Sequence, residues 1–257
     1  LSELEKRDLS HEDFVAVIMD GKIFEKSGII IALGVTISGE KKLIGFVESS
    51  TENEKVISEF LKRLVEKQGL STNAEMLFVI DGSKGLRKGI KNVFGNKGIV
   101  QRCQWHKREN VVSYLPKTQQ ARIRKELQDA YGKPTYQEAL AALMVIRKKL
   151  LLINKSAVAS LDEGLEETLT LHRLDMIEEL GTSFKTTNCA ESFNRQLQIY
   201  TGRVAKWKTS DQRQRWFASA ALEIEPRLNK VKGHKYLRML RDVMRNKNSE
   251  IKLKLAA

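Results

Sequence analysis

The chain has 257 residues, of which 41% are hydrophobic and 30% charged, and its formal net charge is +13 at pH 7. This is the composition of a soluble globular protein, and no segment approaches the roughly 18 apolar residues that a membrane helix needs. Two cysteines cannot form a disulfide framework and fit a reducing compartment, so we expect a cytoplasmic protein with no membrane partner. The first residue is Leu1 and not an initiator Met, which predicts a domain cut from a longer protein.

The positive charge is concentrated in two blocks. Residues 82–108 carry eight Lys or Arg and no acidic residue, and residues 201–257 carry fifteen basic and five acidic side chains. Clustered positive charge is typical of proteins that bind a polyanion, although a basic tail can also serve only solubility. We therefore predict nucleic acid as the partner.

The N-terminal third predicts an antiparallel meander. The apolar run 14–19 indicates a buried strand that ends at Asp20-Gly21. Apolar runs at 28–37 and 43–48 are joined by a short polar connection that contains a glycine, which is typical of a hairpin. We expect these three strands to pair in chain order.

A crossover connection is predicted next. Apolar residues recur at helical spacing over 52–69, and the buried run 76–80 then ends at Asp81-Gly82. A strand, a helix and a second buried strand place the two strands parallel in one sheet. With a short basic helix over 83–94 and a strand over 98–102, the prediction is an α/β fold with a mixed five-stranded sheet flanked by helices.

Residues 107–180 have helical periodicity and no convincing strand. We expect helices over 121–131, 136–152, 157–171 and 174–180, with Gly164 as a weak point. The position of these helices indicates an all-helical insertion. The predicted division is a first core part at 1–106, the insertion at 107–182, and a second core part with a basic tail at 183–257.

Three carboxylates stand in special positions: Asp20 and Asp81 at predicted strand ends, and Glu191 in the first turn of a helix predicted over 190–200. Carboxylate oxygens suit Mg²⁺, so three acids at one sheet edge can hold two ions about 4 Å apart. Such a pair activates a nucleophile beside a phosphodiester. The alternative is that the Asp-Gly pairs are ordinary turn residues and that the polar residues before Glu191 only cap the helix.

Cys103 and His106 are candidates for a metal site of another kind. A structural zinc site needs four ligands, and the other cysteine and histidines show no paired spacing. We expect no zinc, and we interpret the pair as bracing the junction between sheet and insertion. The three tryptophans are expected in the core or at junctions, with base stacking as the alternative; they are Trp105, Trp207 and Trp216.

Four motifs in this order resemble those of the Mutator-type transposases of bacterial insertion sequences: Asp20-Gly21; Ile80-Asp81-Gly82-Ser83-Lys84-Gly85-Leu86; Gln101-Arg102-Cys103 with His106 and Asn110; and Thr186-Thr187-Asn188 with Glu191-Ser192 and Asn194-Arg195. The resemblance extends over about 14–240. It implies an RNase H-like core with an all-helical insertion before the last catalytic helix. It also implies a DDE triad of Asp20, Asp81 and Glu191 that binds two Mg²⁺ or Mn²⁺ ions.

The implied reaction is cleavage of DNA at the ends of an insertion sequence and transfer of the 3′-hydroxyl strand to target DNA. The resemblance further implies a homodimer associated with the bacterial nucleoid, and a structural signature formed by Cys103, His106, Asn188 and Asn194. Two alternatives remain: a metal-dependent nuclease of the same fold, and a non-catalytic DNA-binding module derived from a transposase. The residues expected to bind DNA are Lys84, Arg87, Lys88, Lys91, Arg102, Lys107, Arg108 and Arg195.

Overall fold

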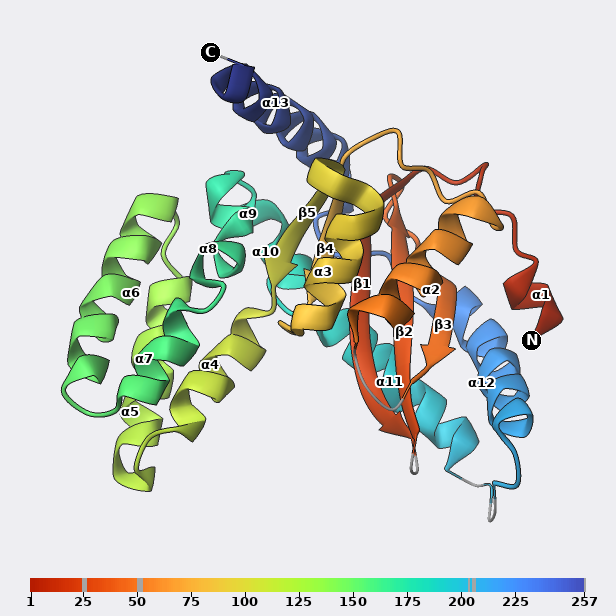
Figure 1. Ribbon diagram of the computed structural model, residues 1–257, viewed down its shortest axis with the longest axis horizontal. Helices are drawn as coiled ribbons and strands as arrows, with labels where there is room; N and C mark the ends of the chain where they lie inside the picture. Colours follow the sequence, from red (N-terminus) through yellow and green to blue (C-terminus); the bar gives the residue numbers. More distant parts are fainter. Residues whose placement is uncertain (25–26, 50–52, 203, 205–206, 257) are drawn as a thin grey trace.

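A five-stranded sheet forms the centre of the protein (Figure 1). The computed structural model describes residues 1–24, 27–49, 53–202, 204 and 207–256. Its strands are β1 (Phe14–Phe24), β2 (Ser27–Thr36), β3 (Lys41–Glu48), β4 (Met76–Ile80) and β5 (Gly98–Arg102). They lie in the order β3-β2-β1-β4-β5, with β1, β2 and β3 antiparallel and β1, β4 and β5 parallel.

The predicted meander, crossover and mixed five-stranded sheet are confirmed, and the arrangement is consistent with an RNase H-like fold. The first strand differs from the prediction because it continues through Asp20-Gly21 to Phe24. Its neighbour β2 pairs with it along this whole length, with Asp20 opposite Ile31. These ladder hydrogen bonds stabilise an extended backbone where an isolated Asp-Gly pair would favour a turn.

Helices cover both faces of the sheet (Figure 1). On one face, α2 (Glu54–Glu66) and α3 (Lys84–Phe94) pack on a hydrophobic cluster that includes Met19 and Phe78. On the other face, residues from the C-terminal helices pack on a second cluster that includes Ile18 and Val79. Successive residues of β1 and β4 therefore alternate between the two faces, as side chains do in any strand.

The second face is covered by the C-terminal part of the chain. Phe193 and Leu197 of α11 and Phe217 of α12 are buried there. The helices of this part are α10 (Ile177–Phe184), α11 (Asn188–Thr201), α12 (Ser210–Ile224) and α13 (Leu237–Ala256), with 3₁₀ turns at Glu225–Arg227 and His234–Tyr236. A short helix, α1 (Ser2–Glu5), precedes the sheet, and a 3₁₀ turn at Gly95–Lys97 precedes β5.

Helices α4 to α9 form a lobe beside the β5 edge of the sheet (Figure 1). Their bounds are α4 (Gln104–Ser113), α5 (Lys117–Tyr131), α6 (Tyr136–Leu151), α7 (Lys155–Asp162), α8 (Leu165–Thr168) and α9 (Thr170–Arg173). The lobe has a hydrophobic cluster of its own, which extends from Val111 to Leu169. Helix α4 runs through residue 106, where we placed the end of the first core part. The division into 1–106, 107–182 and 183–257 stays a prediction.

The single helix predicted over 157–171 is wrong, because the structure divides this segment into three short helices. Gly164 separates the first two, and its φ of +65° lies in the left-handed region that favours glycine. A Cβ at this position would lie 2.2 Å from Nη1 of Arg102. Because the arginine side chain passes so close to residue 164, a glycine is required there. Helix α7 ends just before this glycine.

The helices in the described part of the chain do not combine the length and the apolar character that crossing a membrane would require.

Gly164→Ala should lower the free energy of unfolding by about 1–3 kcal/mol, because alanine is strained at this φ and its methyl group would displace Arg102. Urea unfolding followed by circular dichroism measures the change. Gly132→Ala is the matched control: Gly132 has a φ of −83°, and a Cβ there would meet its nearest atoms at an ordinary 3.4 Å. Equal stability of the two variants would contradict the prediction.

Candidate active site

Asp20 and Asp81 lie next to each other at a step in the sheet. Met19 of β1 is the register partner of Ile80, the last residue of β4, so each aspartate is the next residue on a neighbouring parallel strand. Met19 and Ile80 both face the α2–α3 side. The alternation of side chains therefore directs Asp20 to the α11 side, and Asp81 leaves β4 from the corresponding position.

Helix α11 brings Glu191 to the same side. Glu191 lies in the first turn of the helix, as predicted. Three residues further on, the Asn194 side-chain nitrogen donates a hydrogen bond of 3.2 Å to Oδ2 of Asp20. Both Asp20 and Asn194 are buried, so this bond ties the helix to the centre of the sheet next to the carboxylates.

The Asp20 carboxyl is destabilised in its charged form. Burial raises its pKa to about 7, and the nearby charges of Asp81 and Glu191 act in the same direction. Charge from His106 and the hydrogen bond from Asn194 oppose this shift. The three sequence-predicted carboxylates are thus close enough in the fold to influence one another.

Asp81 is held by a local turn. Its Oδ1 accepts a hydrogen bond of 3.0 Å from the backbone nitrogen of Ser83, and the Ser83 hydroxyl caps α3 by accepting from the nitrogen of Leu86. The turn chemistry that the sequence offered as the alternative is therefore present. It leaves Oδ2 of the carboxylate outside this turn bond, so capping and a further role are compatible.

A threonine joins the signature pair to Glu191. The buried Thr187 hydroxyl lies 3.1 Å from Oε1 of Glu191, 3.4 Å from Nδ1 of His106 and 3.7 Å from Sγ of Cys103. Its single hydrogen can serve one acceptor at a time, and Glu191 is the nearest. Sequence reasoning placed Thr187 only in a capping role, but its side chain makes no cap hydrogen bond.

Cys103 and His106 form a polar pair under the carboxylates. The hydrogen bond to Cys103 raises the pKa of His106 to about 9, against the effect of burial and with support from the charges of Asp81 and Asp20. Burial raises the pKa of the Cys103 thiol, but hydrogen bonds from His106 outweigh it and the net direction is downward. His106 is therefore cationic at neutral pH beside three acids.

Backbone hydrogen bonds of Cys103 and Gln104 connect the sheet to the helices, while a bracing role for the pair of Cys103 and His106 stays a prediction. The backbone nitrogen of Cys103 donates to the carbonyl oxygen of Ile80 at 2.7 Å, and that of Gln104 donates to Lys185 at 2.9 Å. These bonds connect the end of β4, the start of α4 and the end of α10. Asn188, also part of the predicted signature, is the exposed first residue of α11.

The donor chemistry of this site fits a divalent cation. Three carboxylates supply only oxygen atoms, and the pKa of Asp20 is raised first by burial and further by the negative charges of Asp81 and Glu191. The described residues nevertheless contain no group of three His, Cys, Asp or Glu side chains gathered closely enough to hold an ion. Charge and ligand type favour a metal here, whereas the present spacing does not close a three-carboxylate site.

The predicted DNA-binding residues divide into two groups. Those on surfaces are Lys84, Arg87, Lys88 and Lys91 of α3 and Arg195 of α11, while Arg108 is half-buried and pairs with Glu109. Arg102 and Lys107 form the second group, because both are buried. Lys107 donates to the Ser160 carbonyl oxygen at 2.6 Å, and burial lowers its pKa to about 8.

Two of the tryptophans, which were expected in the core or at junctions, lie outside the core. Trp105 and Trp216 are each more than 40% exposed. Trp216 meets Trp207 edge to face, with 6.4 Å between the ring centroids. The aromatic surface of each is therefore only partly covered, and base stacking stays an alternative.

The sheet topology, together with carboxylates from two adjacent parallel strands and a facing helix, is consistent with the RNase H-like class of proteins that process nucleic acids. Comparison of sequences gives the particular family. The family model described as "Transposase, Mutator family" matches residues 1–208, and the chain belongs to this family.

Similar curated proteins are all transposases of bacterial insertion sequences. The chain is 30% identical over 164 residues to the transposase of element IST2 from Acidithiobacillus ferrooxidans, which covers 64% of this chain and 54% of that one. It is 28% identical over 192 residues to that of IS6120 from Mycolicibacterium smegmatis, covering 72% and 58%. For IS256 in transposon Tn4001 from Staphylococcus aureus, identity is 26% over 208 residues, covering 77% and 52%. The chain spans about half the length of these relatives.

Burial of the Asp20 carboxyl group makes the free energy of unfolding depend on pH. Its pKa is about 7 in the folded protein, against about 3.9 in an unfolded chain. Between these values the folded state binds the proton and the unfolded state does not, so this contribution to stability is present at low pH and is lost as the pH rises towards 7. Asp20→Asn should therefore raise the free energy of unfolding by about 1–3 kcal/mol at about pH 8, and the gain should vanish near pH 4.

Urea titrations with a chelator present measure this difference. Asp129→Asn, which alters an exposed aspartate of α5, is the control and should change the stability by less than about 0.5 kcal/mol at both pH values. A gain of equal size at low and high pH would show that charge burial is not its cause.

Proposed function

We propose that this chain is the catalytic domain of a DDE transposase, with DNA as substrate and Asp20, Asp81 and Glu191 as the catalytic residues. The observation that carries the proposal is the convergence of Asp20 and Asp81 from adjacent parallel strands on the helix that bears Glu191, where burial and the charges of Asp81 and Glu191 raise the pKa of Asp20. Membership of the family makes DNA transposition the chemistry that such carboxylates serve.

The reaction has two successive steps. Water attacks phosphorus at the end of the element, the bond to the 3′ oxygen breaks, and a 3′-hydroxyl and a 5′-phosphate are left. The freed 3′-hydroxyl then attacks a phosphodiester of target DNA and displaces its 3′ oxygen. The three carboxylates would hold two Mg²⁺ or Mn²⁺ ions, which would supply activation of the attacking oxygen and stabilisation of the leaving oxygen.

Other residues of the chain position this site. Asn194 orients the Asp20 carboxyl through its hydrogen bond, and the Thr187 hydroxyl orients that of Glu191. His106 is a positioning residue that places positive charge against the acids and fixes Thr187 from the other side. We further propose that the protein acts as a homodimer, because two element ends are handled together. Its DNA would be that of the nucleoid, in the cytoplasm.

Asp81→Asn in the complete protein should reduce metal-dependent nicking at element ends and strand transfer by at least about 100-fold. The reason is that a neutral amide oxygen attracts a divalent cation less strongly than a negatively charged carboxylate does. Gel assays with labelled element ends measure both products, and Asp129→Asn should retain activity. Undiminished activity of Asp81→Asn would remove this residue from the mechanism. Nicking without joining by the unaltered protein would instead indicate a nuclease of the same fold.

The non-catalytic alternative is favoured by one observation, the absence of a closed metal cluster among the described residues. Mn²⁺ binding distinguishes the catalytic domain from the non-catalytic module. At a hundredfold excess over Kd, a bound ion stabilises by about 2.7 kcal/mol, which raises the Tm of a chain of this size by roughly 5–10 °C. We expect this shift in the unaltered protein and in Asp129→Asn, and its loss in Asp81→Asn. A Tm unaffected by Mn²⁺ would support the non-catalytic module.

A further inference from the structure

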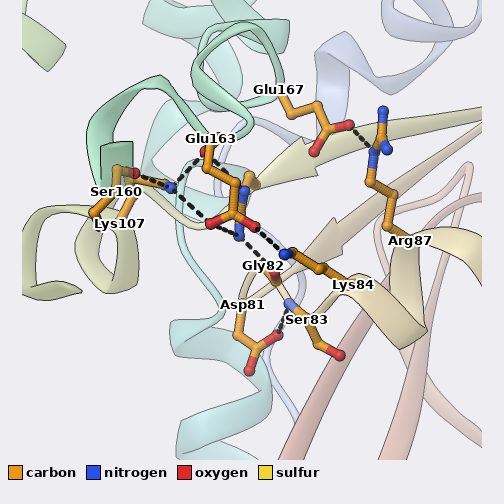
Figure 2. A network of polar contacts seen from close by, with 10 residues as sticks. Asp81, Gly82, Ser83, Lys84, Arg87, Lys107, Ser160, Glu163 and Glu167 are labelled. Atoms are coloured by element: carbon orange, nitrogen blue, oxygen red, sulfur yellow. Dashed lines mark hydrogen bonds and ion pairs between the residues drawn. The ribbon is translucent and has the colours of Figure 1, made fainter. Parts of the chain in front are cut away.

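A small cavity lies between the start of α3 and the turn that joins α7 to α8, beside the candidate active site. Its volume is roughly 230 Å³. Four cationic side chains and two carboxylates line it: Lys84, Arg87, Lys88, Arg102, Glu163 and Glu167. Figure 2 shows Glu163 directed at Lys84 and Glu167 directed at Arg87, both basic residues of α3. The lining therefore carries more positive than negative charge.

Arg102 is the most constrained of these cations. It is only 6% exposed, and its guanidinium passes between Gly82 and Gly164, which both have positive φ. A Cβ on Gly82 would lie 2.1 Å from its Nε, and one on Gly164 would lie 2.2 Å from its Nη1. Two glycines in left-handed conformations thus make room for one arginine. The backbone on both sides is therefore shaped to hold this guanidinium in one position.

One donor of this buried arginine is unused. Nη1 donates to the carbonyl oxygen of Glu163 at 2.9 Å, and Nη2 donates to that of Gly82. The buried Nε has no hydrogen-bond partner in the structure. A buried guanidinium donor without an acceptor is costly, and Arg102 lines the cavity together with three further cations, so the charge of the cavity suits an anion.

Glu163 meets this positive charge only loosely, whereas Glu167 makes a close ion pair with an exposed arginine. Glu163 lies 3.4 Å from Nη2 of Arg102 and 3.8 Å from Nζ of Lys84, and its side chain is 44% exposed. Glu167 pairs with Arg87, whose side chain is 59% exposed. Exposed ion pairs of this kind contribute little and are screened by salt, so another anion can replace them.

The position of the cavity indicates which anion it binds. Gly82, at its wall, directly follows Asp81, and the nitrogen of Ser83 binds the Asp81 carboxylate. A phosphate in the cavity would therefore lie beside the candidate catalytic carboxylate. Lysine and arginine side chains with spare donors are the usual ligands of a DNA phosphate, and carboxylates resemble phosphate in the hydrogen bonds that they accept.

We propose that this cavity binds one phosphate group of the DNA backbone, and that Glu163 and Glu167 are internal competitors that occupy it until DNA displaces them. The inference rests on the proposed function for its ligand, DNA. It adds a regulatory role for the helical insertion, because DNA binding at the core then requires release of the two insertion glutamates. A purely structural role of these ion pairs predicts lower stability on their removal and no change in DNA affinity.

The test compares neighbouring glutamates. Glu167→Gln and Glu163→Gln each remove a competitor and should tighten binding of a labelled DNA duplex roughly two- to fivefold at about 0.1 M salt. Glu166→Gln is the matched control: it removes the same charge from the helix that carries Glu167, but Glu166 pairs with Tyr136 and Arg173 and does not line the cavity. Fluorescence anisotropy in EDTA measures affinity without any catalytic step.

A basic variant completes the test. Arg87→Gln should weaken duplex binding and reduce the slope of log affinity against log salt by about 1, because one phosphate contact is lost. Lys125→Gln, in an exposed position of α5, is the control and should leave the slope unchanged. Thermal unfolding of every variant verifies that each is folded. Arg87 is exposed, so its replacement tests the cavity without disturbing the buried Arg102.

Three results would overturn the inference: no gain in duplex affinity for Glu163→Gln and Glu167→Gln, an equal gain for Glu166→Gln, or a gain for inorganic phosphate alone and none for the duplex. The assay also separates the inference from the proposed function. If the glutamate variants bind DNA more tightly while the complete protein neither nicks nor joins DNA, the phosphate site stands and the transposase mechanism fails. If strand transfer is intact and the affinities are unchanged, the reverse holds.

Discussion

The parallel pairing of β1 with β4 is the constraint on which the site depends. The register of Met19 with Ile80 places Asp20 and Asp81 at equivalent positions of neighbouring strands. Since side chains alternate along a strand, a shift of one residue in β1 would turn Asp20 away from α11. The sheet has a step at this point because β4 ends while β2 continues to pair with β1. Helix α11 then packs over the step, held by Phe193 in the hydrophobic cluster and by the hydrogen bond of Asn194.

Electrostatics at this step oppose folding and favour function. A buried carboxyl group with two acidic neighbours destabilises the native state at neutral pH unless a proton or a cation compensates it. The protein supplies part of this compensation through His106, whose raised pKa keeps it positive, and through donors from Asn194 and Thr187. The remaining excess of negative charge is the property expected of a site that recruits a divalent cation.

The basic block is less open to solvent than its composition predicts. Eight cationic residues over 82–108 indicate an open surface for DNA, yet the fold buries Arg102 and Lys107 and sets glutamates of the insertion against Lys84 and Arg87. The partner of Arg87 lies 80 residues further along the chain, so no local count of charge could have found it. The helical lobe is thus joined to the core through ion pairs, through hydrogen bonds such as that of Thr170 to the carbonyl oxygen of Val100, and through Leu171, which packs in a cluster of the sheet. Most of its apolar residues form a separate cluster.

The sequence by itself determined the order of the elements, the antiparallel meander with its parallel crossover, and the position of Glu191 in the first turn of a helix. These follow from apolar periodicity and capping residues, which act over a few neighbours along the chain. Only the tertiary structure decided that β1 continues past Asp20, that Gly164 divides a helix, that Thr187 faces Glu191 and not the backbone, and which cations are buried. Each of these depends on a strand, a guanidinium or a hydroxyl contributed by a distant segment, and such partners come together only when the chain is folded.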